Sequence, residues 1–280
     1  MLNGKEQMHI CDTVWTRRCD VWRSALPGLL DAAGLPAALR SGKRILIKPN
    51  LVENLPPPIT TPVGLVEALL EYLRENAPGG VEIVIGEGCG SKEDDTWRAF
   101  AGQGYVDLSQ RCGVPLIDLN TEKLVSVANP HCSRWPQMFL PAIVFESFLL
   151  SLPVLKAHSL AGVTLTMKNM MGLAPPAHYQ QGGHWKKAAF HHRIQEAIFD
   201  LNRYRAPDFT LLDATVGMCE AHLWGATCDP PPGLLVAGYD PVAVDAFATG
   251  LLGRDWRQIG HIRLADGVLG TAAGTIVEVA

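Results

Sequence analysis

Three lysines lie in apolar surroundings, where an ammonium group is unusual because lysines are mostly exposed unless they are paired. Lys48 stands in LIKPNL, Lys156 in PVLKAH and Lys168 in LTMKNMM. Any one such lysine is ordinarily a solvated side chain, but three in one chain predict a shared role. Their charges would neutralise a carboxylate or a phosphate, so we predict that the three side chains converge on one anion-binding cleft.

Polar side chains near these lysines complete a candidate active site. Asn50 and Asn169 would orient the anion, and His158 or His191 would move protons. For His191 the alternative is a structural histidine, because it extends the buried stripe of a predicted helix. The catalytic candidates are His158, Lys156, Lys168 and His191. The substrate-binding candidates are Lys48, Asn50, Thr61, Glu87, Asn169, Asp213 and Asp245.

Two of the carboxylates admit a second interpretation. A lysine buried without a counter-charge has a lowered pKa, so a buried lysine commonly takes a carboxylate partner. Asp213 lies at the tip of a predicted strand and Asp245 on the edge of the apolar stripe of a predicted helix. If these two residues pair with the lysines, the lysines are structural and the site lies elsewhere.

A candidate metal site follows near residue 220. Cys219, His222 and Cys228 bring soft ligands within reach of one metal ion, although they number three and are irregularly spaced. Free thiols in an irregular loop are the alternative. The seven cysteines include no CxxC, so we expect neither an intrinsic iron–sulfur cluster nor a disulfide framework.

The elements that would position these residues alternate along the chain. Apolar runs of strand length occur over residues 44–48, 81–85, 114–119, 143–155, 209–212 and 234–237, with helical periodicity between them. This pattern predicts an α/β fold with a mainly parallel sheet flanked by helices, in which ligands collect at the carboxyl ends of the strands. We expect two α/β lobes, residues 1–145 and 146–280, around a cleft. The glycine- and proline-containing segment 162–183 is expected to form a partly helical lid.

Composition narrows the class of protein. The 280 residues include 24 Lys+Arg and 28 Asp+Glu, a net charge of −4, and neither sign forms a long block. This balance, with few aromatic residues, argues against a nucleic-acid-binding protein. The sequence shows neither a signal peptide nor an apolar stretch of bilayer length, so we expect a cytoplasmic protein without membrane contact. Nothing in the sequence indicates an oligomeric state.

Several motifs occur in an order typical of one family. They are Ile47-Lys48-Pro49-Asn50-Leu51, Leu152-Pro153-Val154-Leu155-Lys156-Ala157-His158, Thr164-Leu165-Thr166-Met167-Lys168-Asn169-Met170-Met171-Gly172 and Gly238-Tyr239-Asp240-Pro241. With these motifs the chain resembles the prokaryotic DUF362 family over about residues 45–270. The resemblance implies a redox association, because some members carry a ferredoxin module. This chain lacks that module, so an electron-transfer protein would be an external partner. The resemblance implies no substrate.

Two functions are consistent with these observations. The first is an enzyme that acts on a small anionic metabolite in the cleft between the lobes, reductively if an external donor supplies electrons. The alternative is a binding or delivery protein for a metal, a cofactor or a sulfur species, using Asp213, Asp245, His222 and the two nearby cysteines. Stoichiometric metal bound through thiols would favour the second.

Overall fold

One large, mostly parallel sheet occupies the centre of the molecule. The structure, a computed structural model, describes residues 12–41 and 44–280. The strand order is β12 (Ile276–Glu278), β1 (Val14–Arg18), β11 (Leu234–Gly238), β10 (Phe209–Met218), β7 (Phe148–Leu152), β2 (Arg44–Pro49), β3 (Glu82–Glu87) and β4 (Leu116–Asp118). β8 (Val154–His158) pairs with β10 and with β9 (Gly162–Thr164). The antiparallel pairs of this sheet all involve β11 or β9, so the predicted α/β fold with a mainly parallel sheet is confirmed.

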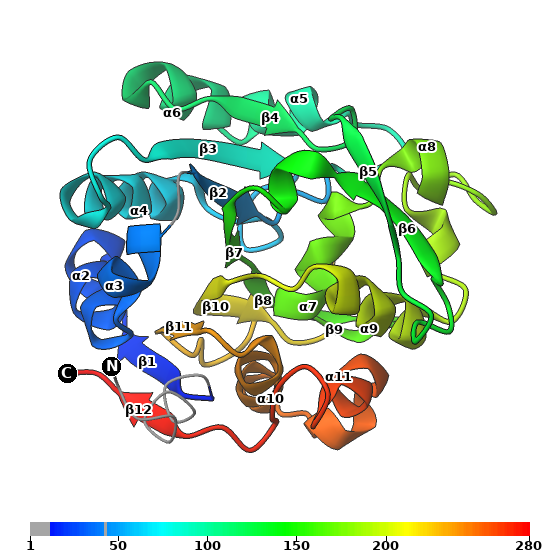
Figure 1. Cartoon of the computed structure of the whole chain (residues 1–280). Coiled ribbons are helices and arrows are strands. Elements are labelled where there is room, and N and C mark those ends of the chain that lie inside the picture. The colour runs from blue at the N-terminus through cyan, green and yellow to red at the C-terminus, as the bar shows by residue number, and fades with distance from the viewer. Residues whose placement is uncertain (1–11, 42–43) are drawn as a thin grey trace.

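Helices cover both faces of the sheet, and the strands alternate between two apolar cores (Figure 1). Ile45 and Ile47 point to one core and Leu46 to the other, as a strand buried on both faces requires. The first core contains α2 (Trp22–Ala32), α3 (Leu35–Ala38), α4 (Val63–Asn76), α5 (Thr96–Gly102) and α6 (Tyr105–Cys112). The second contains α7 (Thr166–Asn169), α8 (Pro176–Tyr179), α9 (Ile194–Tyr204), α10 (Pro241–Leu251) and α11 (Gly260–Ala265).

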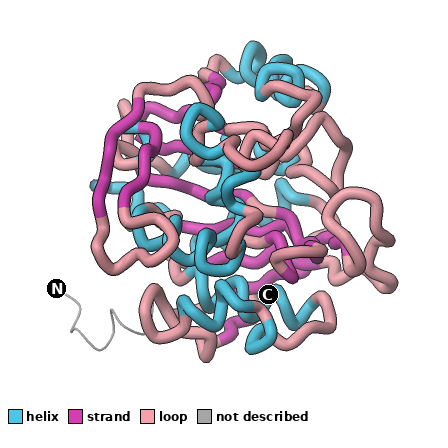
Figure 2. The backbone as a smooth tube through the Cα atoms, turned by 90° about the vertical axis from the view of Figure 1, so that its right-hand side faces the viewer, coloured by secondary structure: helices cyan, strands magenta, loops and turns pink. Residues whose placement is uncertain are grey.

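Several strands cross the middle of the molecule with helices and loops around them, while other strands reach its left edge in this view (Figure 2). A small separate sheet is formed by β5 (Leu124–Ala128) and β6 (Gln137–Pro141). Among the helices within residues 12–41 and 44–280, none combines the length and the apolar character that crossing a bilayer requires.

The two predicted lobes share the central sheet. β1 lies between β12 and β11, and β2 pairs with β7 in a register that sets Ile45 opposite Phe148. A cleft between residues 1–145 and 146–280 would therefore lie at an edge of this shared sheet and not between two separate sheets. The division into lobes stays a prediction.

Two predicted strands differ most from the structure. The run 143–155 begins in the 3₁₀-helix η2 (Ala142–Val144) and becomes strand only at β7. β8 follows after Pro153, a residue without an N–H for the ladder, and continues to His158. The strand predicted over 209–212 continues to Met218, because its second half pairs with β8. Asp213 therefore lies within β10 and not at its tip.

The predicted lid is largely part of the core. Residues 162–173 form β9, α7 and the 3₁₀-helix η3 (Met170–Leu173), and Val163, Leu165 and Met167 are fully buried. The apolar side chains of this segment pack in the same core as α9 and α10. The exposed residues of this region are mainly 180–184, just before the 3₁₀-helix η4 (Ala188–Phe190).

A buried carboxylate fixes the position of α7. Asp245 on α10 accepts hydrogen bonds from the backbone N–H groups of Thr166, at 2.8 Å, and Met167, at 3.0 Å. Burial raises the pKa of Asp245 to about 7. The prediction that Asp245 binds substrate or pairs with a lysine is thus corrected: its oxygens are occupied by the first turn of α7, which presents Lys168.

We predict that Asp245→Ala lowers the free energy of unfolding by roughly 2–6 kcal/mol, because two buried N–H groups lose their acceptor and each costs about 1–3 kcal/mol. Asp245→Asn keeps one acceptor oxygen and should lose less. Urea unfolding monitored by circular dichroism measures both. The exposed Asp20→Ala variant is the control, and a loss for Asp245→Ala no larger than that of the control would contradict this role.

Candidate active site

Four lysines from separate segments line one cavity of about 310 Å³. Lys48 ends β2, Lys156 lies in β8, Lys168 lies in α7, and Lys187 precedes the 3₁₀-helix η4 (Ala188–Phe190). The described polar residues that line the cavity with them include Asn50, Glu87, His158, Thr164, Asn169, Trp185, His191 and His222. The cavity thus lies at the carboxyl ends of parallel strands, where α/β sheets collect ligands.

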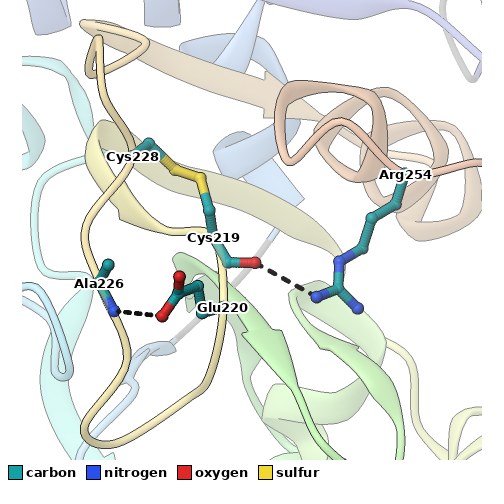
Figure 3. The surroundings of a disulfide bond; sticks show 5 residues. All are labelled: Cys219, Glu220, Ala226, Cys228 and Arg254. Carbon is teal, nitrogen blue, oxygen red and sulfur yellow. Dashed lines mark hydrogen bonds between the residues drawn. A yellow bond between two sulfur atoms is a disulfide. The ribbon is translucent and has the colours of Figure 1, made fainter.

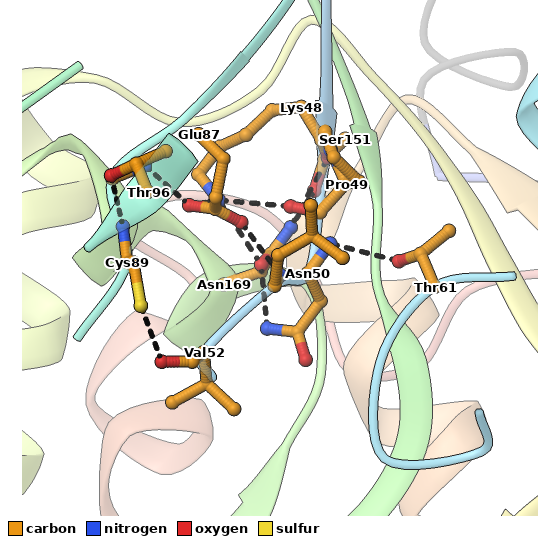
Figure 4. A network of polar contacts seen from close by, with 12 residues as sticks. Lys48, Pro49, Asn50, Val52, Thr61, Glu87, Cys89, Thr96, Ser151 and Asn169 are labelled. Carbon is orange, nitrogen blue, oxygen red and sulfur yellow. Dashed lines mark hydrogen bonds and ion pairs between the residues drawn. The ribbon is translucent and has the colours of Figure 1, made fainter. Parts of the chain in front are cut away.

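Lys48 and Glu87 form a buried ion pair at the base of the cavity (Figure 4). Their side-chain atoms Nζ and Oε1 lie 2.8 Å apart, and both side chains are almost wholly buried. Glu87 also accepts from the backbone N–H groups of Leu51 and Gly88, so its charge is fully engaged. Burial lowers the pKa of Lys48, and the neighbouring Glu87 opposes that shift. Lys48 therefore has its counter-charge within the protein.

Asn50 and Asn169 connect the lysines. Asn169 Oδ1 accepts from Lys48 Nζ at 3.2 Å and from Asn50 Nδ2 at 2.9 Å, and Asn50 Oδ1 accepts from Lys156 Nζ at 2.7 Å. Asn169 Nδ2 donates to Ser151 Oγ at 3.0 Å. Both amides line the cavity, but their bonds hold the lysines in place, so positioning the ammonium groups is the role that their geometry supports.

Thr61 does not line the cavity. Its hydroxyl donates to the Leu152 carbonyl at 2.7 Å and accepts from the Asn50 backbone N–H at 2.8 Å. This buried hydroxyl ties the segment after β2 to the end of β7. The prediction of Thr61 as a substrate-binding residue is corrected on this ground, because both hydrogen-bonding functions of the hydroxyl are used internally.

Lys156 and Lys187 carry ammonium groups that meet neutral oxygens. Lys156 Nζ donates to Asn50 Oδ1 and, at 2.6 Å, to the Ile59 carbonyl, whereas Lys187 Nζ donates to Asn120 Oδ1 and the Ala174 carbonyl. Burial lowers the pKa of each to about 7, and the charge of Lys168 adds to the effect at Lys156. Within the described residues neither forms an ion pair. Lys187 was missed in the sequence, where the Ala-Ala-Phe that follows it was the available signal of burial.

Lys168 differs from the other three lysines. It makes no hydrogen bond or ion pair with any residue of 12–41 or 44–280. Its side chain keeps some contact with solvent. The surrounding protein nevertheless lowers its pKa to about 8 through burial. Its amine is therefore directed to the cavity without an internal acceptor.

Three histidines also line the cavity. His158 Nδ1 accepts from the backbone N–H groups of Leu160 and Ala161, both at 3.1 Å, so the neutral ring carries its proton on Nε2. Burial and the charge of Lys168 lower the pKa of His158 and hold the ring neutral. The ring of His222 stacks on that of His158 with centroids 3.9 Å apart, and burial lowers its pKa to about 4. His191 is exposed, yet it lines the cavity, so it lies where the cavity meets solvent. Partial burial and the charge of Lys168 lower its pKa.

Asp213 lies away from the lysine cavity. Its carboxylate accepts from the backbone N–H of Thr215 at 2.9 Å and from the Thr215 hydroxyl at 2.6 Å, and it lines a second cavity of about 260 Å³. Burial raises its pKa. Among the described residues, neither Asp213 nor Asp245 bonds to a lysine. The interpretation of these two as lysine partners is therefore wrong, and Glu87 holds that role for Lys48.

The candidate metal site is corrected by a disulfide (Figure 3). Cys219 and Cys228 are bonded to each other, with their Cα atoms 5.2 Å apart, so neither thiolate is available as a ligand. His222, on the loop between them, turns to the lysine cavity. Across the part of the chain that the structure describes, no group of three His, Cys, Asp or Glu side chains is arranged to hold a metal ion. The absence of a CxxC was not informative about this pair, because half-cystines nine residues apart can meet across a turn.

The backbone of η3 passes very close to the Lys48–Glu87 ion pair. A Cβ atom on Gly172 would lie 2.2 Å from Glu87 Oε1 and 2.6 Å from Lys48 Nζ. Glycine is therefore required where η3 passes the ion pair. This contact explains the glycine that ends the Lys168-Asn169-Met170-Met171-Gly172 motif.

The fold and this site define an α/β protein with a lysine-lined cavity at the carboxyl ends of its strands. Residues 45–250 match the family described as domain of unknown function (DUF362), and the chain therefore belongs to that family. The expected family membership is confirmed.

Two further proteins are similar to this chain. A thylakoid-associated protein from Synechocystis sp. is 26% identical over 233 residues, which cover 79% of this chain and 67% of that protein. The solved structure of the lactate racemase apoprotein from Thermoanaerobacterium thermosaccharolyticum superimposes with a TM-score of 0.48 and 12% identity, covering 80% of this chain and 53% of the racemase. The chain thus spans about half the length of that enzyme.

The lowered pKa of Lys156 predicts how stability depends on pH. The native protein releases this proton near pH 7, whereas the unfolded chain holds it to about pH 10. Between these values the unfolded state binds more protons, so this group makes the free energy of unfolding rise as pH rises from about 7 to about 10. We expect Lys156→Met to remove that share of the rise.

Urea unfolding at a series of pH values measures the difference between the two proteins, which isolates Lys156 from the other titrating groups. Lys92→Met, at an exposed position, is the matched control and should leave the pH dependence unchanged. Parallel curves for the unmodified protein and Lys156→Met over this range would show that Lys156 is not desolvated.

Proposed function

We propose that the protein is an enzyme that acts on a small anionic metabolite bound in the lysine-lined cavity. The single observation that carries the proposal is that Lys156, Lys168 and Lys187 line the cavity without a carboxylate partner in the described residues. Buried cations without a counter-charge are costly, and an anionic ligand supplies that counter-charge. A carboxylate or phosphate group of the metabolite would take this place.

The neighbouring groups support distinct roles in this proposal. Lys156 and Lys187 are anchored by neutral oxygens and would hold the anionic group. His158 would donate a hydrogen bond from Nε2, because Nδ1 is already occupied. His191, which reaches solvent, would carry protons to and from the cavity. This division refines the expectation that either histidine moves protons.

The remaining expectations rest on the sequence. An external electron donor, a reductive reaction, a cytoplasmic location and the absence of nucleic-acid and membrane partners stay predictions. The alternative of a metal, cofactor or sulfur delivery protein used Asp213, Asp245, His222 and the two nearby thiols. The disulfide between Cys219 and Cys228 removes both thiols from that set, and the two carboxylates accept hydrogen bonds elsewhere.

We predict that inorganic phosphate, sulfate and malonate raise the melting temperature of the protein. A ligand at 100 times its Kd stabilises the native state by about 2.7 kcal/mol. Differential scanning fluorimetry at constant ionic strength, with chloride as the reference anion, measures the shift. Lys156→Met should abolish the anion-dependent part while the protein stays folded.

Lys92→Met changes an exposed lysine and should keep the full shift. Equal anion-dependent shifts in Lys156→Met and in the unmodified protein would place anion binding outside this cavity. A protein that responds to none of the three anions would contradict the proposed function directly.

A further inference from the structure

We propose that Lys168 is a nucleophile that forms an imine with a small anion carrying an aldehyde or ketone group, such as a 2-oxo acid. The inference rests on the proposed function, since the anionic group of the same ligand would be held by Lys156 and Lys187. It adds the chemical class of the substrate and names the reacting atom, Nζ of Lys168.

The hydrogen bonds of the four lysines single out Lys168. Lys48, Lys156 and Lys187 each donate to two or three oxygens of the protein. Imine formation removes both hydrogens of an amine, so these three lysines would lose bonds in a buried place. Lys168 lines the same cavity and has no such bond to lose within the described residues.

Burial favours the neutral, nucleophilic form of Lys168, whose amine also lacks an internal acceptor among the described residues. The groups whose pKa its charge lowers are Lys156, His158, His191, His222 and His261. Burial keeps His158, His222 and His261 neutral near pH 7, so these rings offer Lys168 no counter-charge. The carboxylates nearby are engaged, Glu87 by Lys48 and Asp245 by the first turn of α7. A lysine desolvated in this way can serve as an amine nucleophile.

The short helix α7 holds this amine in a fixed place. Asp245 binds its first turn, Asn202 Nδ2 donates to the Met167 carbonyl at 2.9 Å, and Asn169 is bonded to Lys48 and Ser151. Residues on either side of Lys168 are thus anchored to α10, α9 and the end of the sheet. These contacts would hold the amine in a fixed position near the carbonyl carbon of a bound ligand.

The covalent step balances without a further reactant. The neutral amine of Lys168 attacks the carbonyl carbon, forming a C–N bond and a carbinolamine. The carbon–oxygen bond then breaks, both amine hydrogens leave with that oxygen as water, and a C=N bond remains. The Nε2–H of His158 is a donor for the departing oxygen, and His191 connects the cavity with solvent protons. No atom is oxidised or reduced.

Reductive trapping with glyoxylate tests the assignment. The full chain is incubated with glyoxylate and cyanoborohydride at pH 7.5, and the product is analysed by intact mass and peptide mapping. We expect one carboxymethyl group on Lys168, attached at least about tenfold faster than on exposed lysines such as Lys92, because a lysine of lowered pKa holds more neutral amine at that pH. Acetaldehyde, which lacks the carboxylate, should label Lys168 more slowly.

Lys168→Arg separates this inference from the proposed function. Arginine keeps the positive charge but cannot form the imine, so trapping should disappear while the phosphate-induced rise in melting temperature persists. Lys92→Arg should change neither measurement. Labelling of Lys92 as fast as Lys168, or labelling centred on Lys156 or Lys187, would overturn the assignment of Lys168 while anion binding stands. Loss of the phosphate effect in the unmodified protein would instead overturn the proposed function.

Discussion

The concentration of positive charge around one buried cavity is the constraint on which the rest of the site depends. Four lysines reach it, and among the described residues that line it Glu87 is the one carboxylate. Glu87 pairs with Lys48 and accepts two backbone N–H groups, so it compensates one charge. Lys156 and Lys187 donate hydrogen bonds to carbonyl and amide oxygens. Lys168 faces the cavity without an acceptor among the described residues. In a low-dielectric interior this arrangement favours neutral amines when the cavity is empty and ammonium groups when an anion enters.

The fold supplies this concentration through parallel strands and one short helix. β2 and β8 bring Lys48 and Lys156 to the same edge of the sheet, and Asn50 and Asn169 link them through their amides. α7 then places Lys168 over that edge, because the buried carboxylate of Asp245 caps its first turn. The position of Lys168 therefore depends on the packing of α10 against α7. The same buried polar groups serve the stability of the fold and the proposed function.

Much of this arrangement could be predicted from the sequence, because strand ends carry their functional residues in order. Lys48, Lys156 and Lys168 stand out since each interrupts an apolar run, and parallel strand ends meet at one edge. Asp213 and Asp245 were misjudged because a carboxylate near an apolar run can satisfy its oxygens with local backbone N–H groups, a geometry that spacing does not reveal. Lys187 was missed because its hydrogen-bond acceptors, Asn120 Oδ1 and the Ala174 carbonyl, come from other segments of the chain. The disulfide likewise depends on how the turn after β10 brings Cys228 to Cys219.

The location of a bound anion shows whether the lysines of the cavity form an anion site. Crystals of the full chain soaked in selenate and measured at the selenium absorption edge would reveal the anion by its anomalous scattering. We expect a peak inside the cavity, within hydrogen-bonding distance of the side-chain nitrogens of Lys156 and Lys187. Anomalous peaks confined to the protein surface, with the cavity lacking one at saturating selenate, would contradict the claim that these lysines form an anion site.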